Sequence, residues 1–316
     1  MHPALSVIAF TTFSGAGYGL AFVLALGHGN PGALSTKIGW FVALALIGGG
    51  LLSSTLHLGN PQRAWRAFSQ WRSSWLSREG VMAILTFIPL TLLAAMSIFA
   101  NSFNLFLGYI GAIMCLITVY CTAMIYGSLR TIPQWHTKWT PACYLAFSVT
   151  SGTLIYLALF GREAGSSSNN AWVYLAIVFL VIAWAIKMFW VRNALSAGYG
   201  ESTMETATGL GTLGKVRLLE RPHAMGNYLT NEMAFRVARK HLEKLGWITA
   251  LLVFAMPVIL LLISLFVSSG LGGFLQVLAT ISLMAGLFVE RWLFFAVAKH
   301  AVGLYYGGDE ALVPAE

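Results

Sequence analysis

The chain has 316 residues and a mass of 34.3 kDa; 58% of its residues are hydrophobic, 9% are charged, and the mean hydropathy is +0.74. Soluble domains carry about 25% charged residues, so this composition excludes an ordinary water-soluble enzyme and indicates a protein that crosses a membrane several times. The formal net charge is +8, and the meaning of this excess depends on how the Lys and Arg residues are distributed along the chain.

A helix needs roughly 20 mostly apolar residues to cross the hydrocarbon core of a membrane. In chain order, the stretches that meet this length are 5–27, 37–58, 79–100, 104–127, 141–160, 171–191, 247–268 and 274–298. Continuous apolar runs such as Leu251 to Phe266 lack the alternation of barrel strands, which favours helices. No basic region precedes the first stretch, so we do not expect a cleavable signal. The sequence predicts an all-α integral membrane protein, a single domain over 1–316 with a bundle of eight transmembrane helices.

An even number of spans puts both termini on one side of the membrane, together with the connections 59–78 and 128–140 and the long basic segment 192–246. This side carries fifteen Lys and Arg residues, and the other side carries two, Lys37 and Arg162. Because cationic loops resist translocation, we expect both termini in the cytoplasm and the chain in the inner membrane. The positive charge then reflects topology and contact with anionic lipid. A nucleic-acid partner is not expected, because no soluble domain interleaves a basic patch with exposed aromatic residues.

Charged groups inside a membrane are costly and mark function, and here the acidic ones lie near span ends. Glu79 begins the third predicted span and Glu290 comes late in the eighth. This placement argues against a proton or cation pump, and no paired, Gly/Pro-broken segments suggest an inverted-repeat transporter. Glu290 and Arg291 point about 100° apart on a helix, so they need not pair with each other. We expect an interhelical salt bridge or hydrogen bond there; a place in a proton path is the alternative.

Polar and aromatic residues concentrate in two connections, LHLGNPQRAWRAFSQWRSSWLSREG (56–80) and RTIPQWHTKWTP (130–141). An aromatic belt with snorkelling arginines explains much of this pattern, but it does not require His57 opposite Glu79. Quinone reduction moves two protons with two electrons, and an imidazole donor with a carboxylate proton acceptor suits that chemistry. Both residues also have purely structural explanations. His57 would form a hydrogen bond to a loop carbonyl, and Glu79 would stabilise the start of a helix that is capped by Ser77.

The cysteines and histidines give little support for a metal centre in this protein. Cys115, Cys121 and Cys143 fall in or beside spans, without the spacing of an iron–sulfur or zinc site, and are expected to pack in the interior. A b-type haem needs facing axial ligands, yet of the seven histidines only His57 and His300 lie at span ends. Metal centres would then belong to a partner. The haem alternative would be supported if the absorption spectrum of the purified complex showed a Soret band that copurifies with this subunit.

Several motifs are similar to a known family. LHLGNPQRAWRAF (56–68) followed by SREG (77–80), YGSLRTIPQWHTKWTP (126–141) and, more loosely, VERWLFF…KHAVGLYYG (289–307) resemble the membrane anchor subunit of dimethyl sulfoxide reductase and its relatives. The resemblance implies eight spans, an iron–sulfur subunit and a molybdopterin catalytic subunit as partners, and exchange of electrons with ubiquinone or menaquinone. It implies no haem or iron–sulfur cluster in this protein. The quinone-site positions of the family match His57, Gly59, Arg63 and Glu79.

The long segment 192–246 departs from the dimethyl sulfoxide reductase anchor, which has a short connection there. It resembles instead the anchors of cytoplasmic, quinone-reducing sulfite dehydrogenases. Its second part, NYLTNEMAFRVARKHLEKL (227–245), has the spacing of an amphipathic helix, which would lie on anionic lipid or dock the iron–sulfur subunit. Together with the predicted topology, this favours electron transfer from sulfite to quinone. The alternatives are a quinol-oxidising anchor of the dimethyl sulfoxide reductase type and a transporter without a redox partner.

Overall fold

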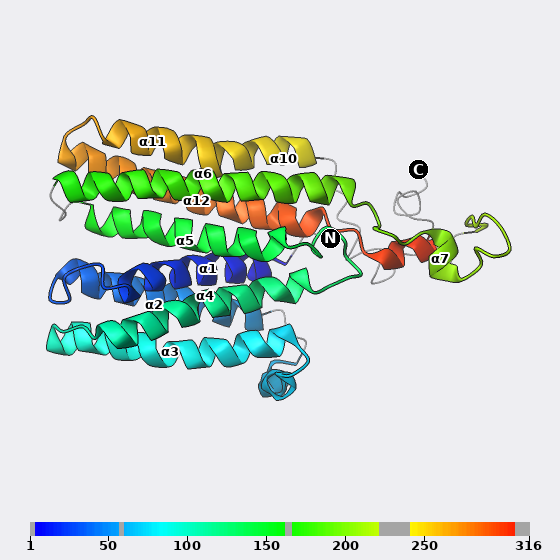
Figure 1. Ribbon diagram of the computed structural model, residues 1–316, viewed down its shortest axis with the longest axis horizontal. Coiled ribbons are helices and arrows are strands. Elements are labelled where there is room, and N and C mark those ends of the chain that lie inside the picture. Colours follow the sequence, from blue (N-terminus) through cyan, green and yellow to red (C-terminus); the bar gives the residue numbers. More distant parts are fainter. Residues whose placement is uncertain (1–3, 57–59, 162–165, 221–240, 307–316) are drawn as a thin grey trace.

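The computed structural model describes residues 4–56, 60–161, 166–220 and 241–306, and these contain helices and no strand. Long helices run side by side along one direction (Figure 1). They are α1 (Leu5–Ala25), α2 (Leu34–Thr55), α3 (Trp75–Ala100), α4 (Leu105–Gly127), α5 (Trp139–Phe160), α6 (Ser166–Ser196), α10 (Leu242–Thr249) continued by α11 (Met256–Ser264), and α12 (Ser269–Ala296). In the described part of the chain, eight spans are long and apolar enough to cross a membrane, which agrees with the predicted number.

Two spans differ in detail from the predicted ones. Helix α6 has 31 residues, where the sequence predicted 171–191, because it continues as a helix through polar residues at both ends. Hydropathy detects only the apolar part of a helix that suits the hydrocarbon core. The predicted length is therefore too short for a helix that extends beyond the membrane. Consequently the predicted segment 192–246 begins inside α6 and ends inside α10.

The seventh span is not a uniform α-helix. Between α10 and α11 lies a π-helical segment, η2 (Ala250–Ala255), directly before Pro257. A proline within a helix has no N–H to donate to the carbonyl four residues earlier, and its ring crowds that carbonyl. Widening the preceding turn to the π form removes the conflict without ending the helix.

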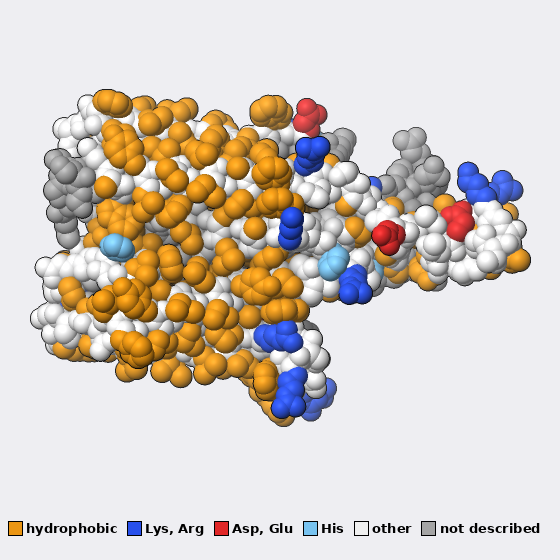
Figure 2. All heavy atoms as spheres, viewed as in Figure 1, with side chains coloured by type: hydrophobic (Ala, Val, Ile, Leu, Met, Phe, Trp, Pro, Cys, Tyr) orange, Lys and Arg blue, Asp and Glu red, His pale blue; other side chains and the backbone are white. Residues whose placement is uncertain are grey.

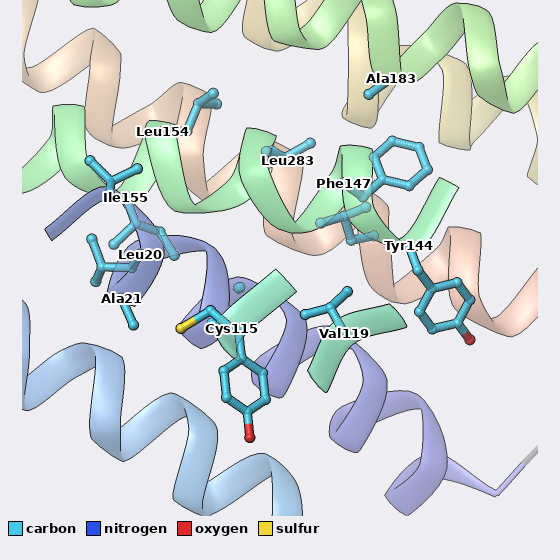
Figure 3. Close-up of a cluster of buried hydrophobic side chains, with 14 of the residues drawn as sticks. Leu20, Ala21, Cys115, Val119, Tyr144, Phe147, Leu154, Ile155, Ala183 and Leu283 are labelled. Carbon is cyan, nitrogen blue, oxygen red and sulfur yellow. The ribbon is translucent and has the colours of Figure 1, made fainter. Parts of the chain in front are cut away.

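Helices α1 and α5 form the centre of the bundle. Figure 3 shows Leu20 and Ala21 of α1 near Ile155 of α5, with Cys115 and Val119 of α4 close by. All of these side chains are buried, and all three cysteines are buried and free, as the sequence predicted.

Close approach of α1 and α5 depends on two glycines. A Cβ built on Gly19 would collide with the backbone carbonyl of Ser148, and one on Gly152 would collide with the backbone of Gly19. Small residues let membrane helices approach to backbone contact, where van der Waals packing replaces the hydrophobic effect as the driving force.

We expect Gly19→Ala to separate α1 from α5 and to destabilise the bundle by at least the usual cost of overpacking, about 1–3 kcal/mol. The measurement is the thermal unfolding midpoint of the detergent-solubilised protein. Gly48→Ala in α2 is the matched control, because nothing lies within 4 Å of its Cβ position. Equal midpoints for the two variants would contradict the assigned contact.

The two ends of the bundle differ in charge. Helix α1 begins and α12 ends at the same end, and η1 (Pro61–Gln70), α7 (Met204–Thr208) and η3 (Ala301–Tyr306) lie beyond it (Figure 1). Lys and Arg side chains gather at this end, whereas hydrophobic side chains cover the helices (Figure 2). We call it the basic end. Within the described residues, the opposite end carries one cation, Lys37, which fits the predicted distribution of charge.

Three connections join into a platform beyond the basic end. Gln134 accepts a hydrogen bond from the Lys299 backbone N–H at 3.0 Å and donates to the Gly198 carbonyl at 2.6 Å. Tyr305 of η3 donates to the Ala207 carbonyl of α7 at 2.6 Å. The connection after α4, the segment after α6 and the segment after α12 are thereby held together, a contact that residue spacing could not reveal.

Candidate functional site

Glu79 lies in the second turn of α3, not at its first residues. The N-cap is Ser74, whose side chain accepts the backbone N–H of Ser77 at 3.4 Å. The prediction that Ser77 caps the helix is wrong: its hydroxyl donates instead to the carbonyl of Ala67 in η1. Because α3 begins at Trp75, Glu79 has no capping role, and the helix-end explanation of its position loses its basis.

The Glu79 side chain is turned into the bundle and is only 5% exposed. Thr122 of α4 donates to Glu79 Oε1 at 3.4 Å and shares that proton with the Thr118 carbonyl of its own helix. Among the described residues, no Lys or Arg forms an ion pair with this carboxyl group. Buried charge is costly unless it is paired and fully hydrogen-bonded, so the surroundings of Glu79 suit a group that gains and releases a proton.

Further hydroxyl groups lie in the same part of the bundle as this carboxyl group. Tyr18 of α1 and Tyr126 of α4 lie within electrostatic reach of it. The Tyr18 hydroxyl has no hydrogen-bond partner in the part of the protein that the structure describes. One helical turn from Thr122, Thr118 meets Thr86 of α3 at 2.9 Å between their hydroxyl oxygens. The junction of α1, α3 and α4 is therefore polar inside an apolar bundle.

The other predicted site residues are placed differently. Arg63 lies in η1 with its side chain exposed, and no contact with Glu79 is found among the described interactions. His57 and Gly59 lie outside the described residues, so the proposed meeting of His57 with Glu79 stays a prediction. Segment η1 itself rests on the start of α3, where a Cβ on Gly80 would stand 2.9 Å from the Phe68 ring.

The aromatic residues of the two connections separate into two groups. Trp65 and Trp71 are exposed, each beside an arginine that stacks on it, as an aromatic belt requires. Trp135 is instead buried and donates from Nε1 to the Phe294 carbonyl of α12 at 2.8 Å. Trp139 stacks on Phe189 of α6 with ring centroids 4.8 Å apart. Exposed tryptophans in the first connection agree with the belt interpretation, which stays a prediction, whereas Trp135 of the second connection packs inside the protein.

A second charged group lies buried between α6 and α12. Lys187 Nζ is 2.5 Å from Glu290 Oε1, which confirms the predicted interhelical salt bridge. Glu290 also pairs with its sequence neighbour, a contact that the sequence did not require: Arg291 Nε lies 2.8 Å from Glu290 Oε2. Neighbouring side chains on a helix point about 100° apart, and the arginine side chain is long and flexible enough to bridge that angle. The Arg291 guanidinium carbon lies 3.9 Å from the centre of the Tyr144 ring. We call Lys187, Glu290 and Arg291 the charged triad.

Metal binding finds no support among the described residues, which contain no group of three or more His, Cys, Asp or Glu side chains placed to share an ion. His300 accepts the Val302 backbone N–H on Nδ1 at 3.0 Å, and burial lowers its pKa below the usual value. Neutral imidazole suits that contact. His136 Nδ1 forms a hydrogen bond with the Gly127 carbonyl oxygen at 2.8 Å.

A separate apolar cavity of about 340 Å³ lies near the basic end between α6, α10 and α12, with Trp184, Trp190 and Trp247 among its lining residues. Its volume falls in the usual range of small-molecule pockets. No pattern in the sequence indicated it, because its walls come from segments far apart along the backbone.

The protein matches the model of the family described as DMSO reductase anchor subunit (DmsC) over residues 1–297. It belongs to this family and is the multi-pass membrane anchor subunit of a DMSO reductase-family oxidoreductase complex, which confirms the resemblance seen in its motifs. A sulfite dehydrogenase subunit of Allochromatium vinosum is 33% identical to it, over 97% of this protein and 99% of the relative. A polypeptide of the anaerobic dimethyl sulfoxide reductase of Escherichia coli is 29% identical over 36% of this protein and 41% of that relative.

Proposed function

We propose that this protein anchors a sulfite-oxidising molybdenum and iron–sulfur complex and binds the quinone that receives its electrons. The observation that carries the proposal is Glu79, a buried carboxyl group that has no paired cation among the described residues and lies near the basic end, where α3 meets α4. A membrane anchor that exchanges protons as well as electrons needs a group of this kind next to its redox lipid.

In our proposal the quinone headgroup binds beside Glu79, at the end of the bundle where η1 packs on the start of α3. Glu79 offers a carboxyl group with one hydrogen-bond partner, Thr122, in the described part of the protein. In our proposal Glu79 passes protons to one quinone oxygen, and His57 donates a hydrogen bond to the other. Gly59 is the further residue that we assign to the site, and Arg63 supplies positive potential from η1. When bound, the quinone accepts two electrons and two protons; the side chains orient it and move the protons.

Sulfite is favoured as the electron source because similarity to the sulfite dehydrogenase subunit of Allochromatium vinosum extends over 97% of the protein, including the long segment after α6. The concentration of Lys and Arg at the basic end supports a cytoplasmic location for that end in the inner membrane. The iron–sulfur subunit would dock there and connect the molybdopterin catalytic subunit. Because the quinone site and the proton source then share one side, quinone reduction would not be electrogenic by itself. The alternative is a complex of the dimethyl sulfoxide reductase type that oxidises quinol.

The complex itself supplies a direct test. We expect the tagged protein, purified from its native membrane in mild detergent, to bring along two further subunits with molybdenum and iron, and the preparation to reduce quinone when sulfite is added. The measurements are metal analysis and the absorbance change of quinone. Quinol oxidation by dimethyl sulfoxide without sulfite activity would favour the alternative; a stable, metal-free lone subunit would indicate a transporter.

The location of the quinone is tested separately with a photoreactive quinone analogue. We expect cross-links on α3, α4 and the segment around residue 57. Cross-links confined to Trp184, Trp190 and Trp247 would move the site to the cavity between α6, α10 and α12 and overturn the assignment to Glu79.

A further inference from the structure

The charged triad carries an uncompensated charge. Lys187 and Arg291 are cationic and Glu290 is anionic, which leaves a net charge of +1, and all three residues are at most 5% exposed. Glu79 forms no ion pair with them among the described residues. An isolated charge inside a membrane protein is unfavourable, and a buried group of ions with unbalanced charge destabilises the folded state. A further negative partner would therefore stabilise the triad.

A small cavity lies against the guanidinium of Arg291. It has a volume of about 20 Å³ between α1, α5 and α12, and Thr11, Thr12, Tyr144, Ser148 and Ser151 contribute hydroxyl groups to its wall. This volume holds one water molecule or an ion of similar size. Tyr144 and Phe147 can be followed on α5 in Figure 3.

Three hydrogen-bond donors at this cavity lack a partner. Thr11 donates to the Val7 carbonyl of its own helix, Ser148 to the Gly15 carbonyl and Ser151 to the Phe147 carbonyl. In contrast, Thr12 Oγ1, the Tyr144 hydroxyl and Arg291 Nη1 are buried without a hydrogen bond of normal geometry among the described residues, and the Tyr144 hydroxyl interacts electrostatically with Arg291. Unsatisfied buried donors are rare and call for a bound species.

We propose that this cavity binds a small monovalent anion of the halide class, held by Arg291, Thr12 and Tyr144. A water molecule accepts two hydrogen bonds and leaves the charge of +1 in place. An anion accepts from all three donors, gains a charge-assisted bond from the guanidinium and neutralises the triad. The anion thereby links α1, α5 and α12, and its binding does not depend on the identity of the redox lipid.

Thermal unfolding of the purified full-length protein, alone or in its complex, tests the site. We expect the unfolding midpoint to rise by about 2–5 °C when sodium gluconate is replaced by sodium chloride or bromide at equal ionic strength, because a ligand that binds only the folded state stabilises it. Thr12→Val should remove most of this shift, since it keeps the shape but loses the donor. Thr11→Val is the matched control, because Thr11 lines the same cavity with a hydroxyl already bonded to its own helix.

The variant Lys187→Gln tests whether the net charge of the triad attracts the anion. It brings that net charge to zero and leaves Glu290 paired with Arg291, and Lys187 is not among the residues that line the cavity. We expect this variant to lose the halide shift as well. Bromide should also give an anomalous diffraction peak next to Arg291 Nη1. A shift that is absent, or equal in wild type, Thr12→Val and Thr11→Val, would overturn the proposal, as would a water molecule in place of bromide.

Discussion

Glu79→Gln is expected to lower quinone-linked turnover of the assembled complex by about 10²–10⁴-fold, the usual contribution of a positioned proton-transfer group. Glutamine keeps the size of the side chain and its ability to accept from Thr122, but it cannot carry a proton to the quinone. The measurement is sulfite-dependent reduction of a water-soluble quinone analogue by membranes or by the purified complex.

The same preparation supplies the control readout. Oxidation of sulfite with an artificial acceptor that takes electrons directly from the partner subunits should remain at the wild-type rate, because Glu79 is remote from those subunits' catalytic chemistry in our proposal. Glu201→Gln is the matched variant, an exposed glutamate outside the spans, and should leave both activities unchanged. Wild-type quinone reduction by Glu79→Gln would remove its role as a proton relay.

The largest effect on stability is expected at the charged triad. Glu290→Gln leaves Lys187 and Arg291 buried together without their shared carboxylate, which is 2.5 Å from one and 2.8 Å from the other. Removing one member of a buried ion group destabilises proteins by about 3–5 kcal/mol, because the remaining charge stays buried and unpaired. Total stabilities are about 5–15 kcal/mol, so we expect a sharp fall in the unfolding midpoint and in the amount of folded protein in the membrane.

Lys187→Gln distinguishes this explanation from loss of packing. It removes one cation but leaves the pair of Glu290 with Arg291, so we expect a clearly smaller loss of stability than for Glu290→Gln. Glu243→Gln in α10 is a surface control, because this glutamate is exposed. If Glu290→Gln and Lys187→Gln unfold at the same temperature, the carboxylate does not have the central role that the geometry gives it.

Much of the fold follows from local sequence. A run of apolar residues long enough to cross the membrane is sufficient to predict a helical span. In the hydrocarbon core no water can bind backbone N–H and C=O groups, so conformations that leave these groups unpaired are excluded. For this reason all eight spans were found, with ends that differ by a few residues. The ends are less well determined, because polar residues continue a helix beyond the hydrocarbon, as in α6. The true start of α3 was missed for a related reason: Ser74 and Ser77 are both plausible caps, and the contact of Ser77 with Ala67 of η1 decides between them.

The candidate site was only partly predictable. The sequence placed Glu79 near the start of the third span, but its burial and its neighbours Thr122 and Tyr18 depend on which helices pack together. Lys187 showed no partner in the sequence, since Glu290 is 103 positions away. Trp135 and Trp139 look like Trp65 and Trp71 in the sequence, and only the structure shows that Trp135 is buried against α12 and that Trp139 packs on Phe189 of α6.

The sequence by itself determined that this is a helical membrane protein with eight spans, one basic end and the motifs of its anchor family, because apolar length and loop charge act locally along the backbone. Only the tertiary structure decided the α1–α5 contact through Gly19 and Gly152, the charged triad and the unpartnered donors near Arg291. Those features depend on pairs of helices that all look equally apolar in the sequence, and the choice among them is made by the fit of side chains across the whole bundle.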